Sequence, residues 1–82
     1  MQIDSLKYFI DACRLQSMTG AAEVNRVTRP AISQASLKLE AELGISLLNH
    51  KKRGFELTQA GQRVAWSATQ VFGAIDQLRL IA

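Results

Sequence analysis

The sequence predicts a mainly α-helical fold in which three helices and a small two-stranded hairpin precede one long helix. Three observations predict it. Residues 17–44 have the pattern of a short helix, a tight turn and a longer helix. A basic turn at residues 51–54 lies between two short apolar segments. From residue 64 onward, apolar residues recur about every 3.5 positions, the period of a helix that packs along a partner helix.

The first helix is expected to span residues 4–15. Its apolar residues follow the i, i+3, i+4, i+7 pattern of an amphipathic helix, and Asp4 is a suitable N-cap. Because Cys13 falls on the apolar stripe, it is predicted to be a small core residue rather than a reactive thiol. The stripe consists of Leu6, Phe9, Ile10 and Cys13.

A second, short helix is expected to begin at Ser17 or Thr19, either of which can cap it, and to end near Asn25. Ala21 and Ala22 lie in its middle. Their small side chains predict that another helix approaches closely at this point.

The third helix is expected to run from Thr28 to Leu43, after a turn at residues 26–27. Thr28 is a good N-cap. Pro30 is tolerated because the N–H groups of a first turn have no acceptor within the helix. The glycine that follows is a typical helix end. A helix-turn-helix unit is therefore predicted over about residues 18–37.

The two faces of this third helix differ. Ile32, Leu39 and Leu43 are expected to point into the core together with Ser36, a position where a larger apolar residue would be more typical. The opposite face presents polar groups, and the residues that lead it are Arg29, Ser33 and Gln34. Arginine can contact guanine and glutamine can contact adenine through paired hydrogen bonds, and helix N-termini favour phosphate. An ordinary polar helix face is the alternative.

The net charge of +3 is concentrated in one third of the chain. Residues 26–53 contain six basic and two acidic side chains, a net charge of +4, so the remainder carries −1. A basic patch attracts phosphate backbones by Coulomb steering and counterion release. Nucleic-acid binding is therefore one interpretation, and a solvated basic face is the other.

A β-hairpin with a basic tip, here called the wing, is expected over about residues 47–57. An apolar run precedes the basic turn at residues 51–54, and residues 55–57 follow as a brief alternating strand. Arg53 suits a narrow, electronegative minor groove. The single histidine, His50, is expected to have a polar or phosphate-facing role rather than a catalytic one.

One long helix is expected over residues 59–82, with Thr58 as its cap. Its apolar seam predicts pairing with the same helix of a second subunit. The alternative is packing against its own domain, which Phe72 favours locally. The seam residues expected at the dimer interface are Val64, Ala68, Val71, Ile75 and Leu78.

Several function classes are disfavoured by composition. Eighty-two residues allow one small domain. One cysteine and one histidine cannot form a disulfide framework or a usual structural zinc site. We therefore expect no metal site, no cofactor, no catalytic residues and no enzyme activity. No apolar segment is as long as a membrane span and no signal-peptide pattern is present, so no membrane association and a cytoplasmic location are expected.

Short motifs along nearly the whole chain, in order and spacing, resemble the DNA-binding domain of LysR-type transcriptional regulators. The resemblance implies a winged helix-turn-helix domain (residues 1–58) and a linker helix that dimerises it (residues 59–82). The motifs are Leu6-Lys7-Tyr8-Phe9, Ser17-Met18-Thr19-x-Ala21-Ala22, Pro30-Ala31-Ile32-Ser33, Leu39-Glu40, Leu43-Gly44 and Leu57-Thr58-x-Ala60-Gly61.

The resemblance also implies a function. A homodimer, able to form a tetramer in the full-length protein, would bind an inverted-repeat operator in double-stranded DNA. A small-molecule effector would bind a domain beyond this chain. The recognition helix, residues 28–43, would enter the major groove, and the wing would lie on the backbone or minor groove. The residues expected to contact DNA are Thr19, Thr28, Arg29, Pro30, Ser33, Gln34, Lys38, Lys52, Arg53 and Gly54.

Several positions depart from the pattern usual in that family. Arg29 replaces a common glutamine on the recognition face, so a changed base preference is expected. His50 replaces a common arginine, Asn25 a usual leucine, and Ser36 a large aliphatic residue. Two alternatives remain open: a winged-helix domain of another regulator family, or a winged helix that binds only proteins. The basic tip of the wing and Arg29 argue against the second.

Overall fold

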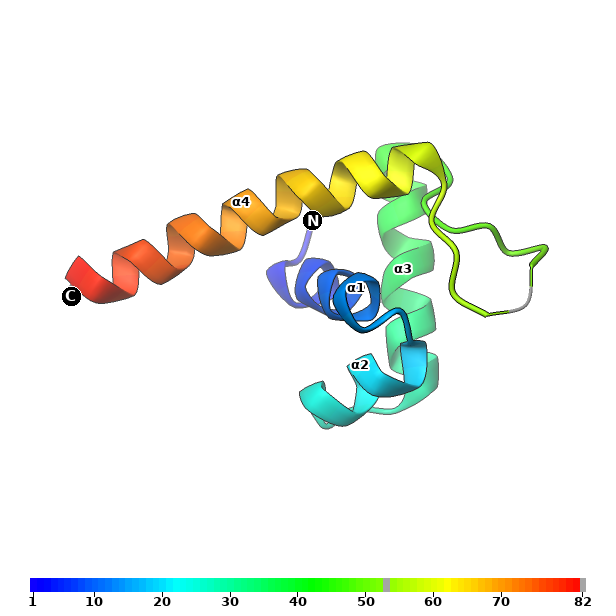
Figure 1. Cartoon of the computed structure of the whole chain (residues 1–82), viewed down its shortest axis with the longest axis horizontal. Helices are drawn as coiled ribbons and strands as arrows, with labels where there is room; N and C mark the ends of the chain where they lie inside the picture. Colours follow the sequence, from blue (N-terminus) through cyan, green and yellow to red (C-terminus); the bar gives the residue numbers. More distant parts are fainter. Residues whose placement is uncertain (53, 82) are drawn as a thin grey trace.

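The computed structural model describes residues 1–52 and 54–81. Within these residues the chain forms four helices: α1 (Ile3–Leu15), α2 (Met18–Asn25), α3 (Arg29–Leu43) and α4 (Gln59–Ile81). The first three pack against one another, and α4 crosses α1 before extending away from them (Figure 1). The predicted helical class and the order of the helices are confirmed.

Polar caps set the start of α2 and α3. The hydroxyl of Ser17 accepts a hydrogen bond from the Gly20 N–H at 2.9 Å. The hydroxyl of Thr28 accepts one from the Ala31 N–H at 3.3 Å. Each bond satisfies a backbone donor that has no partner within its helix. Of the two residues predicted to cap α2, the structure selects Ser17, and the cap predicted for α3 is confirmed.

The cap predicted for α1 is wrong. This helix begins one residue earlier, at Ile3, and Gln2 occupies the cap position without a side-chain hydrogen bond. Asp4 lies in the first turn instead. A negative charge there still interacts favourably with the helix dipole, so the acidic residue supports the same helix end by another route.

The turns after α2 and α3 use left-handed backbone conformations. Arg26, at the predicted turn, has φ of 57°, and Gly44 ends α3 with φ of 67°. The Val27 N–H bonds to the Ala22 carbonyl at 3.0 Å. This closes the end of α2, so that only three residues separate α2 from α3.

The core consists of two neighbouring apolar clusters. The first unites α1, α3, the start of the wing and α4, and its buried members are Leu6, Phe9, Leu39, Leu47, Leu48 and Ala68. The second lies where α2 meets α1 and α3, and its buried members are Ala12, Ala21, Ala22 and Ile32. Three of these four are alanines, which supports the close approach predicted from the adjacent Ala21 and Ala22.

Ser36 and Cys13 place a hydroxyl and a thiol in or against this apolar core. Ser36 is 1% exposed, and its hydroxyl donates a hydrogen bond to the Ile32 carbonyl at 3.2 Å. The helix backbone thus satisfies the serine internally. Cys13 packs against the first cluster, and burial raises the pKa of its thiol to about 12. The thiol is therefore neutral at physiological pH, as its predicted core position requires.

Asn25 belongs to a polar network between α1 and α2. Its amide donates to the carboxylate of Asp11 at 2.9 Å and to the Ala21 carbonyl at 2.8 Å. Lys7 donates to Asp11 at 2.7 Å and to the Asn25 side-chain oxygen at 2.8 Å. The network supplies partners for Asp11, which is only 8% exposed.

This network predicts a loss of stability in acid. Burial raises the pKa of the Asp11 carboxyl, but hydrogen bonds from Lys7 and Asn25 and the charges of Lys7 and Arg14 outweigh burial and lower that pKa below its ordinary 3.8. The folded state then binds the proton less readily than the unfolded state, so the stabilisation is complete above pH 3.8 and is lost as the pH falls through the lowered pKa.

We expect the free energy of unfolding of the wild type to exceed that of Asp11→Asn at pH 7. This difference should shrink as the pH falls below 3.8, the ordinary pKa of aspartate. Urea denaturation at a series of pH values measures it. A difference that stays constant from pH 7 down to pH 2 would contradict the assignment.

The segment between α3 and α4 differs from the predicted two-stranded hairpin. In its described residues, the β-pairing is a single antiparallel bridge between Leu48 and Leu57. One reason is that the N–H group of Leu47, which would face the Thr58 carbonyl if the ladder continued, donates to the carboxylate of Glu40 instead. This irregular segment, residues 47–57, is still called the wing below.

The last helix is half packed and half exposed. It starts after Thr58, whose hydroxyl accepts from the Gly61 N–H at 2.9 Å, as predicted. Ala68 is 3% exposed against the first core cluster, whereas Leu78 is 64% and Ile81 83% exposed. The C-terminal half of α4 therefore projects away from the helices that form the core (Figure 1). Among the described residues, no helix has the length and apolarity needed to cross a membrane.

Candidate nucleic-acid interface

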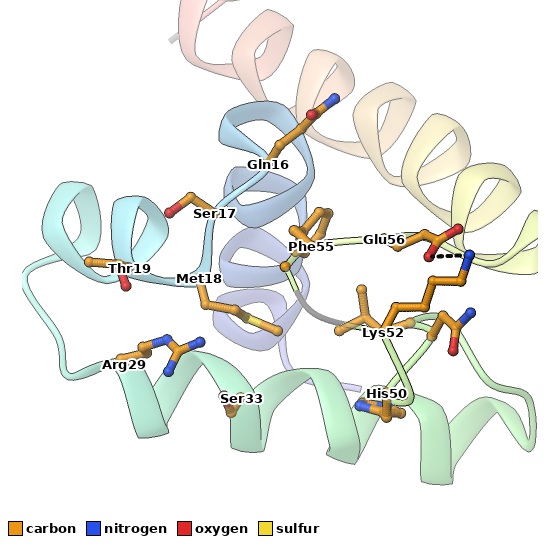
Figure 2. Close-up of a pocket in the computed structure, with 13 residues that line it drawn as sticks. Gln16, Ser17, Met18, Thr19, Arg29, Ser33, His50, Lys52, Phe55 and Glu56 are labelled. Carbon is orange, nitrogen blue, oxygen red and sulfur yellow. Dashed lines mark ion pairs between the residues drawn. The ribbon is translucent and has the colours of Figure 1, made fainter.

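α2, α3 and the wing enclose a groove of about 400 Å³ on one face of the molecule (Figure 2). The start of α2 and the first turns of α3 form one side, and the wing forms the other. The groove brings together elements that are distant in sequence. The predicted DNA-binding residues that line it are Thr19, Arg29, Ser33, Lys52 and Gly54.

The remaining predicted residues lie outside this groove. They are exposed along α3, and they extend its polar face from the N-terminus to the third turn. These residues are Thr28, Pro30, Gln34 and Lys38. Arg53 lies outside the described residues.

Arg29 occupies the first position of α3 and is exposed to solvent. In Figure 2 it lies between α2 and α3, close to Thr19. Neither Arg29 nor Lys38 forms an ion pair with any carboxylate in the described part of the chain. Their charges are thus available to an anionic ligand.

The wing contributes a second cation at the far side of the groove. Lys52 faces Glu56 at 3.8 Å, and both side chains are largely exposed. Such an exposed, long ion pair contributes little to stability. Lys52 can therefore exchange Glu56 for a phosphate at little cost. Gly54 has φ of 78°, a conformation that favours glycine at this bend.

His50 is held against α3. Its Nε2 atom lies 2.9 Å from Oε1 and 3.1 Å from Oε2 of Glu40. Burial alone would raise the pKa of the Glu40 carboxyl. The hydrogen bonds from His50 and from the N–H groups of Leu47 and Leu48 outweigh burial and lower that pKa below its ordinary value.

Two apolar residues that the sequence did not single out also line the groove. Met18 and Phe55 are half-buried and pack against both core clusters, so they join the groove to the core. In the sequence, these residues are visible only as one apolar residue directly after the cap Ser17 and another directly after the basic turn. Neither pattern indicates that the two side chains meet in one groove, because that depends on how the wing folds back.

The seam residues of α4 fall into two groups. Ala68 is buried and Val64 half-buried against the core of the same chain. Ala68 is therefore not available to a second subunit. Val71 and Leu78 are 41% and 64% exposed, and Ile75 is half-buried. The exposed part of the seam thus begins at Val71.

The helix-turn-helix arrangement and the groove beside α3 define the chain as a regulator-type helix-turn-helix domain. The profile of bacterial regulatory helix-turn-helix proteins of the lysR family matches residues 3–62, so the chain belongs to this family. The family resemblance noted in the sequence is confirmed.

Individual relatives support the assignment. The nitrogen assimilation regulatory protein nac of Klebsiella aerogenes is 36% identical over 80 residues, which are 98% of this chain and 26% of that protein. The HTH-type transcriptional regulator BudR of Raoultella terrigena is 34% identical over 76 residues, 93% of this chain and 26% of that protein. The chain thus spans about a quarter of the length of these curated relatives.

Solved structures agree with the fold. The DNA-binding domain of BenM in complex with catB site 1 DNA has a TM-score of 0.92 at 31% identity, covering 99% of this chain and 90% of that chain. The DNA-binding domain of CbnR in complex with DNA has a TM-score of 0.86 at 35% identity, covering 94% and 88%. Full-length BenM has a TM-score of 0.87 at 32% identity, covering 95% of this chain and 26% of that one.

Proposed function

We propose that this chain is the DNA-binding part of a transcription regulator that binds an inverted repeat in double-stranded DNA as a homodimer. One observation carries the proposal: the exposed start of α3 and the wing share a groove, and the cations of that groove are unpaired or only weakly paired in the described residues. The complexes of the BenM and CbnR DNA-binding domains with DNA support it.

In the proposed complex, the N-terminal half of α3 lies in the major groove. Arg29, Ser33 and Gln34 contact base edges, because their side chains match the donor and acceptor patterns displayed there. Thr28 and Pro30 approach the same groove at the helix start. Residues that surround this face would hold phosphates and fix the register; they are Thr19, Lys38, Lys52 and Gly54, with Arg53 proposed from sequence alone.

The remaining assignments follow from the same proposal. Residues 1–58 would form the DNA-binding domain and residues 59–82 the linker helix that joins two subunits, chiefly through Val71, Ile75 and Leu78, with Val64 at the edge of the contact. In the full-length regulator the dimers can assemble into tetramers, and a small-molecule effector would act on another domain. The protein would work in the cytoplasm, without enzymatic activity.

Selection of bound sites from a random pool of duplexes tests the proposed function. We expect an enriched two-fold symmetric sequence, and binding that weakens steeply with salt because phosphate contacts release counterions. A winged helix that serves only as a protein-interaction module would enrich no sequence. Absence of both enrichment and salt-dependent binding would reject the proposal.

The Arg29→Ala variant should lose about 1–3 kcal/mol of binding free energy per half-site, because one arginine–guanine pair is worth that much, and therefore about 2–6 kcal/mol on the whole inverted repeat, where both subunits lose the pair. Preference at one base pair of each half-site should relax. Electrophoretic mobility shifts on the selected site and on single-base variants measure both effects. Arg63→Ala is the matched control, since it removes the same charge from an exposed position of α4. Equal losses for Arg29→Ala on selected and random duplexes would exclude base recognition by Arg29.

A further inference from the structure

One carboxylate joins the recognition helix to the wing. Glu40 lies in the second half of α3, and its side chain is only 12% exposed. Its Oε2 atom accepts hydrogen bonds from the N–H groups of Leu47 at 2.7 Å and Leu48 at 3.2 Å. The hydroxyl of Ser46 donates to the same atom at 3.3 Å. His50 completes the set with Nε2 at 2.9 Å from Oε1.

These donors all belong to the stretch in which the chain leaves α3 and enters the wing. A regular hairpin would position its arms by a ladder of backbone hydrogen bonds. Here the described residues of the two arms share a single bridge between Leu48 and Leu57, which consists of the hydrogen bonds from the Asn49 N–H to the Glu56 carbonyl at 2.9 Å and from the Thr58 N–H to the Leu47 carbonyl at 3.0 Å. The position of the wing relative to α3 therefore depends heavily on contacts with the helix.

The contact between His50 and Glu40 reaches the groove proposed to bind DNA. His50 lies beside α3 and lines the same groove as Arg29 and Lys52 (Figure 2). Hydrogen bonds to a charged acceptor are stronger than neutral ones. The carboxylate of Glu40 can thus hold the first residues of the wing at a fixed offset from the start of α3.

We propose that Glu40 is a positioning residue for DNA binding. It fixes the start of the wing against α3, so that the cations of the wing meet the DNA backbone in register with the side chains of α3 in the major groove. This inference rests on the proposed function. Glu40 need not touch DNA itself, because it acts through Leu47, Leu48 and His50.

A positioning role for Glu40 predicts a change in DNA affinity opposite in sign to the change expected from charge alone. Removing an acidic side chain near DNA should strengthen binding, because the net positive charge rises. If Glu40 positions the wing, Glu40→Ala should instead weaken binding to the selected duplex by about tenfold or more. Glu42→Ala is the matched control: it removes the same charge two residues further along α3, where the carboxylate faces the N-terminal amine at 3.6 Å rather than the wing.

The position of the loss along the DNA identifies its cause. Duplexes are prepared with and without the base pairs that flank the bases contacted by α3. The wild type should bind the longer duplex more tightly and with a steeper salt dependence, because wing phosphates add to the contacts. Glu40→Ala should lose most of this gain. Glu40→Gln, which keeps an oxygen acceptor for Leu47 and Leu48, should recover part of it.

A second measurement needs no DNA. Trypsin cleavage after Lys51 or Lys52 should be faster in Glu40→Ala than in the wild type and in Glu42→Ala, at a temperature where circular dichroism shows all three folded. His50→Ala should increase cleavage in the same direction by a smaller factor, since it removes one of the contacts. Unchanged cleavage in Glu40→Ala would overturn the inference.

The outcomes separate the two proposals. A wild type that binds DNA, with a Glu40→Ala loss that is equal on short and long duplexes, would overturn only the positioning role. A wild type that binds no duplex would overturn the proposed function, and the inference with it.

Discussion

Gly61→Ala should destabilise the protein by about 3 kcal/mol or more, at or beyond the upper end of the usual cost of overpacking. A Cβ atom at this position would overlap the carbonyl oxygen of Leu47 and lie 3.1 Å from the Leu57 side chain. The Leu47 carbonyl cannot move away cheaply. It accepts the Thr58 N–H at 3.0 Å, and the Leu47 side chain is fully buried. Urea denaturation measures the change in the free energy of unfolding.

Gly73→Ala is the matched control for this prediction. It introduces the same methyl group into the same helix, but nothing lies within 4 Å of the added Cβ. Alanine is a better helix former than glycine, so this variant should gain about 0.5–1 kcal/mol. Opposite signs for the two variants are therefore expected. A similar small effect at both positions would show that α4 does not press on the start of the wing.

The contrast between these glycines shows where sequence-based prediction ends. Gly61 and Gly73 both lie inside a predicted helix, and helical periodicity assigns them the same status. The approach of the Leu47 carbonyl, fourteen residues before Gly61, and of the Leu57 side chain distinguishes them. The decisive atom is a backbone carbonyl, and the sequence around Gly61 contains no trace of its position.

Local features were predictable because they depend only on residues that are close in the sequence. A cap such as Ser17 or Thr28 acts on donors three residues away, so its role is visible in a short window of sequence. Apart from Asp4, which lies in the first turn of α1 and not at its cap, the failures concern contacts between distant segments. The partner of Asn25 is Asp11, and that of His50 is Glu40. Neither pair could be deduced from spacing, because each depends on how two elements cross.

The wing illustrates the limit most clearly. Alternation of residue type and the turn at residues 51–54 predicted the bend and its basic character, but not the absence of a ladder among its described residues. The backbone N–H of Leu47 has two possible partners, the Thr58 carbonyl in a continued ladder or the carboxylate of Glu40, and the composition of the segment does not decide between them. For the same reason the sequence did not predict that Phe55 lines the groove, because Phe55 reaches the groove only when the wing folds back toward α3.

Val71→Asp combined with Leu78→Asp should abolish dimerisation and, with it, the preference for an inverted repeat over a single half-site. These two seam positions are 41% and 64% exposed in the single chain, so the substitutions leave its core intact. In the proposed dimer they would place charges in an apolar contact, where an unpaired charge is strongly unfavourable. Sedimentation velocity gives the oligomeric state.

The effect on DNA follows from the loss of the second binding domain. Two linked domains gain about 10²- to 10⁴-fold in affinity over one when both half-sites are engaged. The double variant should lose this gain on the inverted repeat, but it should bind a single half-site as tightly as the wild type binds one. The matched control, Gln70→Asp with Gln77→Asp, adds the same charges with the same seven-residue spacing on another exposed face of α4.

The half-buried Ile75 is left unchanged in this test because its side chain lines a hollow between α1 and α4, where a charge could destabilise the chain itself. The two exposed positions therefore separate association from folding. A double variant that is folded and still sediments as a dimer would show that the subunits pair through another surface. In that case the leucines and isoleucine at the end of α4, of which Ile81 is 83% exposed, would need a different partner.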